Sequence, residues 1–152
     1  MTKGDFLKPF PARHTCRKCK YAFAGKILSL TENNKTMRFN NPGEHPLDAI
    51  SVDDCWLQQQ TACDFLVLDW QGHPYLVELK GGNIQRALDQ LEETLRTLMP
   101  THIREPISCF LIAKDVSIPR TKIQNREKTM RGTWPYVEII PKSRQHTHCL
   151  AP

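Results

Sequence analysis

Two carboxylates and an amine near the centre of the chain have the types and spacing for metal-assisted hydrolysis. They are Asp64, Glu78 and Lys80. Side chains alternate along a strand, so Glu78 and Lys80 of Glu78-Leu79-Lys80 are expected on one face. Two neighbouring carboxylates bind a hard cation such as Mg²⁺, and the carbonyl of Leu79 could add an oxygen. A nearby lysine can orient an attacking water or offset charge on a phosphorane, as phosphodiester hydrolysis requires.

The segments that must position these groups are two apolar stretches joined by a short connection. Cys63 to Leu68 is apolar except for Asp64, and Tyr75 to Lys80 is rich in residues favoured in sheets. The connection, residues 70–74, has the length of a hairpin loop. We therefore expect two neighbouring antiparallel strands that bring Asp64 close to Glu78.

A helix is expected directly after Gly81-Gly82. Asn83 is a good N-cap, and Pro100 ends the helix. One apolar face is predicted from leucine and isoleucine residues spaced by three and four: Ile84, Leu88, Leu91, Leu95 and Leu98.

The remaining segments predict a single α/β domain over residues 1–152. Strands are expected at 26–30, 36–40, 107–113 and 136–140, and a basic helix within 118–131, whereas 49–52 is a short apolar piece without an assigned structure. Residues 1–20 read as an irregular, basic, cysteine-bearing segment, 49–140 as the core, and 143–152 as a tail. This order predicts one mixed sheet flanked by helices.

At these residues the chain resembles the PD-(D/E)xK, or restriction endonuclease-like, nuclease superfamily. Its core is a mixed sheet flanked by helices, with the aspartate and the E-x-K on adjacent strands. Many members carry a glutamine in the next helix, often as A-x-x-Q-L, and Ala87-Leu88-Asp89-Gln90-Leu91 matches that pattern. The resemblance covers roughly residues 52–99. The segment that contains Asp64 and Glu78-Leu79-Lys80 is similar to small restriction-endonuclease-like proteins of bacteria and mobile elements.

The resemblance implies roles for individual residues. Asp64 and Glu78, with the Leu79 carbonyl, would hold Mg²⁺ or Mn²⁺. Lys80 would be the catalytic lysine and Gln90 would support the site. Cys63 replaces the proline of the family name.

Many members add an acidic residue from an early helix, but no such helix is evident before Asp64. Asp53 and Asp54 are the nearest candidates for that role, and Glu32 is a further one. A second metal site depends on one of them.

The expected activity is that of a Mg²⁺-dependent endonuclease acting on nucleic acid, with DNA expected as the substrate in preference to RNA. Such proteins serve restriction, phage defence, recombination or repair, and related enzymes commonly form homodimers. Two alternatives stay open: an inactive nucleic-acid- or partner-binding protein on the same fold, and a zinc-stabilised interaction module.

The charge of the chain agrees with a polyanionic partner. Its 152 residues carry a formal charge of +5 and a pI near 9.0. Basic residues gather in the predicted helix within 118–131, where candidate phosphate contacts are Arg120, Lys122, Arg126 and Lys128. Binding through them would depend on salt.

The six cysteines are expected to be reduced thiols. The first ten residues lack the apolar region of a signal peptide, and no apolar run is long enough to span a bilayer, so we expect a cytoplasmic protein. The cytosol keeps thiols reduced, which argues against a disulfide framework. Cys55, Cys63 and Cys109 are read as buried thiols. Cys16 and Cys19 form a C-x-x-C that could bind structural Zn²⁺ with further ligands.

Overall fold

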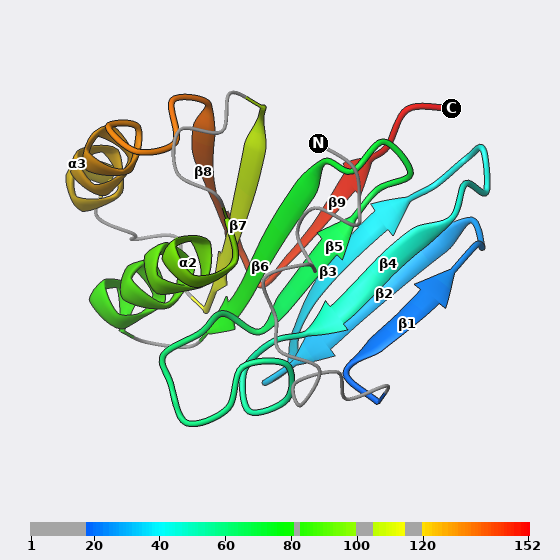
Figure 1. Cartoon of the computed structure of the whole chain (residues 1–152), viewed down its shortest axis with the longest axis horizontal. Coiled ribbons are helices and arrows are strands. Elements are labelled where there is room, and N and C mark those ends of the chain that lie inside the picture. Colours follow the sequence, from blue (N-terminus) through cyan, green and yellow to red (C-terminus); the bar gives the residue numbers. More distant parts are fainter. Residues whose placement is uncertain (1–17, 81–82, 100–104, 115–119) are drawn as a thin grey trace.

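The computed structural model describes residues 18–80, 83–99, 105–114 and 120–152, which form two sheets and two helices (Figure 1). The strands are β1 (Lys20–Phe23), β2 (Ile27–Glu32), β3 (Lys35–Asn40), β4 (Leu47–Ser51), β5 (Phe65–Leu68), β6 (Pro74–Lys80), β7 (Ile107–Ala113), β8 (Val137–Ser143) and β9 (Gln145–Cys149). The helices are α2 (Ile84–Leu98) and α3 (Arg120–Met130).

The larger sheet has six strands in the order β1-β4-β5-β6-β7-β8. The pairs β1–β4, β4–β5 and β5–β6 are antiparallel, whereas the pairs β6–β7 and β7–β8 are parallel. Parallel neighbours need a crossover, and α2 supplies it between β6 and β7, as α3 does between β7 and β8. A second sheet has the order β2-β3-β9.

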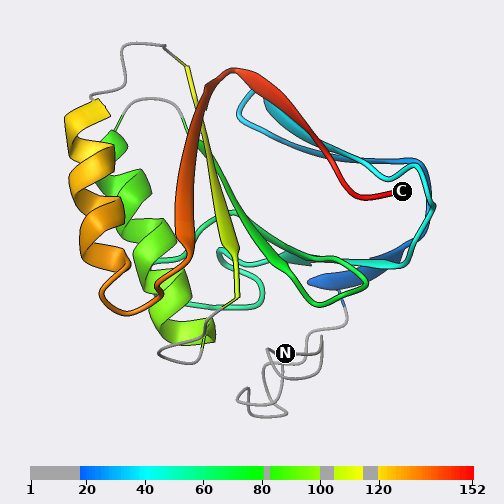
Figure 2. The same ribbon diagram turned by 90° about the horizontal axis from the view of Figure 1, so that it is seen from above.

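The two faces of the larger sheet are covered differently (Figure 2). Both described helices lie against one face, and the three-stranded sheet lies against the other. On the helix side, Leu66 and Leu76 pack with Leu88 and Leu91 of α2, and we call this cluster the helix-side core. Between the sheets, residues such as Phe39 and Phe110 form a second cluster, the inter-sheet core.

The elements around the predicted site agree closely with the sequence pattern. The hairpin of β5 and β6 is present, and its strands pair with Phe65 opposite Val77. Helix α2 begins at Ile84, and the side chain of Asn83 accepts a hydrogen bond from the backbone N–H of Arg86 at 3.0 Å. The predicted N-cap and helix start are therefore confirmed.

The prediction of one sheet followed by a tail is wrong. Residues 143–152 include β9, which pairs in parallel with β3, with Thr36 opposite Gln145. The segment is rich in polar residues and histidine, so its sequence lacks the apolar alternation of a strand. The chain also begins a strand at Lys20, inside the segment expected to be irregular; residues 1–17 lie outside the described part.

The reduced state expected for the cysteines is also corrected. Cys19 and Cys55 form a disulfide, with 36 residues of sequence separation and Cα atoms 5.5 Å apart. Cys19 is therefore not available as a zinc ligand in this structure, and Cys16 lies outside the described residues. Cys63 and Cys109 are free and buried, as predicted.

None of the helices in the described ranges is both long and apolar enough to cross a membrane.

Candidate functional site

Asp64 is tied directly to the strand that carries Glu78 and Lys80. Its Oδ2 accepts a hydrogen bond from the backbone N–H of Leu79 at 2.7 Å. Asp64 precedes β5 by one residue, and Leu79 lies between the other two predicted site residues. The hairpin thus brings the first carboxylate to the E-x-K segment.

The pairing register brings the two carboxylates together. Phe65 lies opposite Val77, so the next pair outward is Asp64 and Glu78. Leu66 and Leu76, two residues further along each strand, both belong to the helix-side core. Since side chains alternate along a strand, Asp64 and Glu78 share that face. Both are buried, with exposed fractions of 8% and 1%.

Helix α2 fixes the backbone immediately before Asp64. The side-chain amide of Gln90 donates to the Ala62 carbonyl at 3.0 Å. The backbone N–H of Cys63 donates to Oγ1 of Thr94 at 2.7 Å, and that hydroxyl in turn donates to the Gln90 carbonyl at 2.6 Å. Gln90 and Thr94 are both buried. The predicted helical glutamine, Gln90, therefore contacts the backbone two residues before Asp64.

The Cys63 thiol lies within the field of both carboxylates. Burial raises its pKa well above the ordinary value, a hydrogen bond with Thr94 lowers it, and the charge of Glu78 and, more weakly, that of Asp64 raise it again. The thiol is therefore neutral and is unsuited to act as a nucleophile.

Lys80 is the last residue of β6, and its backbone pairs with Ala113 of β7. Its side chain lies outside the described part of the structure, as do Gly81 and Gly82. The structure therefore locates only the backbone of the predicted catalytic lysine, two residues beyond Glu78 on β6.

A polar hollow of about 470 Å³ opens beside the first half of α2. Gln90 and Ala62 contribute to its wall, so it adjoins the segment that α2 holds. The loop between β4 and β5 closes the other side and includes Asp53 and Asp54. These two aspartates, proposed from sequence as further acidic residues, thus reach the neighbourhood of Gln90. Glu32 lies on β2 in the second sheet, away from this hollow.

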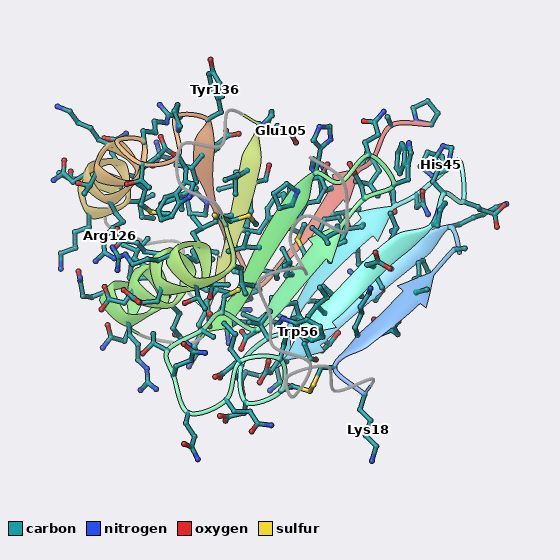
Figure 3. The ribbon with its side chains drawn as sticks, viewed as in Figure 1. Lys18, His45, Trp56, Glu105, Arg126 and Tyr136 are labelled. Carbon is teal, nitrogen blue, oxygen red and sulfur yellow. A yellow bond between two sulfur atoms is a disulfide. The ribbon has the colours of Figure 1, made fainter. Side chains whose placement is uncertain are left out.

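The basic residues of α3 do not form a uniform surface. Arg126 is only 16% exposed and forms ion pairs with Asp89 at 2.8 Å and Glu92 at 3.8 Å, both on α2 (Figure 3). It therefore joins the two helices. Arg120, Lys122 and Lys128 are exposed.

Among the described residues, no three His, Cys, Asp or Glu side chains gather as a metal-binding group. A cation held by Asp64 and Glu78 would accordingly take its other oxygens from the backbone or from water, as Mg²⁺ commonly does.

Thr94 was missed by sequence reasoning, although its spacing of four from Gln90 places both on one helix face.

Comparison with protein-family models, with curated proteins and with solved structures gives no match to this chain.

Proposed function

We propose that this protein is a metal-dependent nuclease that hydrolyses phosphodiester bonds of DNA, built on a restriction endonuclease-like core. The observation that carries the proposal is the hydrogen bond from the Leu79 N–H to Asp64, together with the register that sets Asp64 opposite Glu78. Two buried carboxylates on adjacent strands, followed by a lysine and a glutamine-bearing helix, are the parts expected from the sequence.

The arrangement of elements supports a restriction endonuclease-like core. An antiparallel run of β4, β5 and β6 is followed by α2 and by the parallel strand β7. Asp64 and Glu78-Leu79-Lys80 then occupy adjacent strands, and Gln90 lies on the helix that follows. One departure is that a second sheet covers the face opposite the described helices.

The residues present fit a divalent cation. Carboxylate oxygens are ligands that Mg²⁺ prefers in proteins, and the carboxylates of Asp64 and Glu78 are both buried. Asp64 uses one oxygen for the Leu79 N–H, which orients its carboxylate. Asp64 and Glu78 would hold Mg²⁺ or Mn²⁺, with the Leu79 carbonyl and water as further ligands. When bound, such an ion supplies Lewis acidity at the scissile phosphate and lowers the pKa of a bound water.

The other residues have distinct tasks in this proposal. Lys80 stabilises negative charge on the reacting phosphate or orients the attacking water. Gln90 and Thr94 are positioning residues, because their hydrogen bonds hold residues 62 and 63 directly before Asp64.

The test is cleavage of supercoiled plasmid DNA with Mg²⁺, with Mn²⁺ and with EDTA. Wild-type protein should cut only with the metal, and Glu78→Gln and Lys80→Ala should each lose at least about a hundredfold in rate. Glu138→Gln is a matched control, because Glu138 is an exposed carboxylate on β8 and should not matter.

Metal-independent cutting, or full activity in Glu78→Gln and Lys80→Ala, would refute the proposed site. Binding of DNA without cleavage by the wild type would favour an inactive binding protein on this fold. A matched RNA substrate in the same buffer separates a deoxyribonuclease from a ribonuclease.

A further inference from the structure

A second hollow, of about 410 Å³, is lined by three cations and two amides. Its lining residues are Asn33, Asn34, Lys35, Lys114 and Arg144. They come from three separate places: the turn between β2 and β3, the residue after β7, and the link between β8 and β9. Among the described residues of this lining there is no carboxylate.

The backbone around the hollow is fixed by unusual but well-supported conformations. Asn33 and Asn34 have φ of 52° and 61°, so they form a two-residue turn of the type that suits an antiparallel hairpin. Arg144 has φ of 63° and is the single residue between β8 and β9. Its N–H donates to the Ala113 carbonyl at 2.8 Å, and its carbonyl accepts from the Thr36 N–H at 3.1 Å. Arg144 is therefore anchored to both sheets.

Lys35 is a charged side chain that is nine-tenths buried in this wall. Its exposed fraction is 7%, and its Nζ donates to the Asn33 carbonyl at 3.0 Å. An ammonium carries three N–H donors, and burial of its charge is costly without compensation. An anion in the hollow would compensate the ammonium, with Lys114 and Arg144 on the remaining sides.

The hollow lies at the same end of the larger sheet as the candidate active site. Lys80 pairs with Ala113, and Ala113 in turn pairs with Ser143. Lys114 and Arg144 are the residues that follow these two partners. Neighbouring strands are about 4.8 Å apart, so the hollow begins within a few strand spacings of Lys80.

We propose that this hollow binds a backbone phosphate of the DNA substrate, next to the strand that is cut. This proposal rests on the proposed nuclease function and adds to it the site that holds the flanking backbone. Arginine, lysine and amide donors suit phosphate oxygens, and such contacts position the nucleic acid without reading its sequence.

The test measures binding of fluorescently labelled DNA duplexes by anisotropy in EDTA, where no cutting is expected. The double variant Lys114→Gln and Arg144→Gln should weaken binding about tenfold, and equally for two unrelated sequences. The slope of log affinity against log salt should fall in magnitude by about 0.9, the value for one phosphate. Inorganic phosphate should weaken the wild type more than the double variant.

The control is Lys26→Gln, which removes an exposed lysine at the opposite end of β2 and should leave both affinity and slope unchanged. If the double variant does not fold, as judged by circular dichroism, Lys114→Gln alone is used. The side chain of Lys114 is exposed. Nε of Arg144 donates to the backbone carbonyl of Lys114, which the substitution leaves in place.

Unchanged affinity and slope in these variants would overturn the phosphate site even if the wild type cuts DNA. Loss of binding in the variants, from a wild type that binds without cutting, would support the hollow while refuting the nuclease function. A wild type that binds no DNA overturns the phosphate site outright.

Discussion

The carboxylate of Asp64 and the backbone N–H of Leu79 are joined by a 2.7 Å hydrogen bond. The acceptor precedes one strand, and the donor lies in the middle of the E-x-K segment on the next. The bond therefore couples the orientation of one proposed metal ligand to the strand that carries the other. This coupling allows the structural and the chemical contributions of Asp64 to be separated.

Asp64→Asn should keep an oxygen acceptor for Leu79 but remove the negative charge. We expect near wild-type stability and a loss of at least about a hundredfold in metal-dependent cleavage. Asp64→Ala should lose the same activity and also about 1–3 kcal/mol of unfolding free energy, because it leaves a buried N–H without its acceptor. Urea unfolding and plasmid cleavage measure the two effects. Equal stability of both variants would contradict this role of the hydrogen bond.

Thr94→Val should destabilise the protein and slow cleavage. The substitution removes the acceptor of the Cys63 N–H, a buried bond of 2.7 Å, at a cost of about 1–3 kcal/mol. Thr97→Val is the matched control: its hydroxyl also donates to the carbonyl four residues earlier, that of Glu93, but it lies exposed on the same helix. Similar losses of stability in both variants would show that the contact with Cys63 is unimportant.

Reduction of the Cys19–Cys55 disulfide should destabilise the fold by about 4 kcal/mol, the loop-entropy value for 36 residues. Guanidinium unfolding with and without a thiol reductant measures the difference. Cys55→Ser should show the lower stability in both buffers, so the reductant has no further effect on it. A wild type that is indifferent to the reductant would argue against the disulfide.

His148 should make stability depend on pH on the acid side. Burial lowers its pKa from 6.5, and its ring lies 5.3 Å from those of Tyr75 and Phe110 between centroids. The unfolded chain therefore takes up this proton more readily than the folded protein. Stability is retained above about pH 6.5 and falls as the pH drops below it.

His148→Gln should flatten this decline, since glutamine does not titrate. Urea midpoints on either side of about pH 6.5 provide the measurement. His45→Gln is the control, because His45 stacks on Trp70 at a different place. A decline of unchanged steepness in His148→Gln would show that other groups cause it.

The order of the central elements could be predicted because their signals are local. The apolar run of Ile107–Ala113, the N-cap Asn83 and the period of α2 all lie within short windows of sequence. The hairpin of β5 and β6 could be predicted for the same reason, since its two strands are close in the sequence.

The second sheet and the disulfide could not be predicted because they depend on distant partners. Strand β9 has an alternating exposed and half-buried pattern, and its partner β3 lies far earlier in the chain. Cys19 was read with its close neighbour Cys16, whereas its partner in the structure is Cys55. Proximity in sequence was a misleading guide in both cases. The hollow around Lys35 likewise forms only after both sheets are in place.

The pairing of β3 with β9 has a consequence for synthesis of the protein. Asn40 and Cys149 are 109 residues apart, so β3 leaves the ribosome long before the strand that completes its sheet. Until β9 emerges, the apolar face that carries Met37 and Phe39 lacks part of its cover. Closure of a contact over so long a loop is slow, and exposed strand edges favour aggregation. We therefore expect the nascent chain to depend on chaperones or slow assembly at this step, whereas the β5–β6 hairpin can form early.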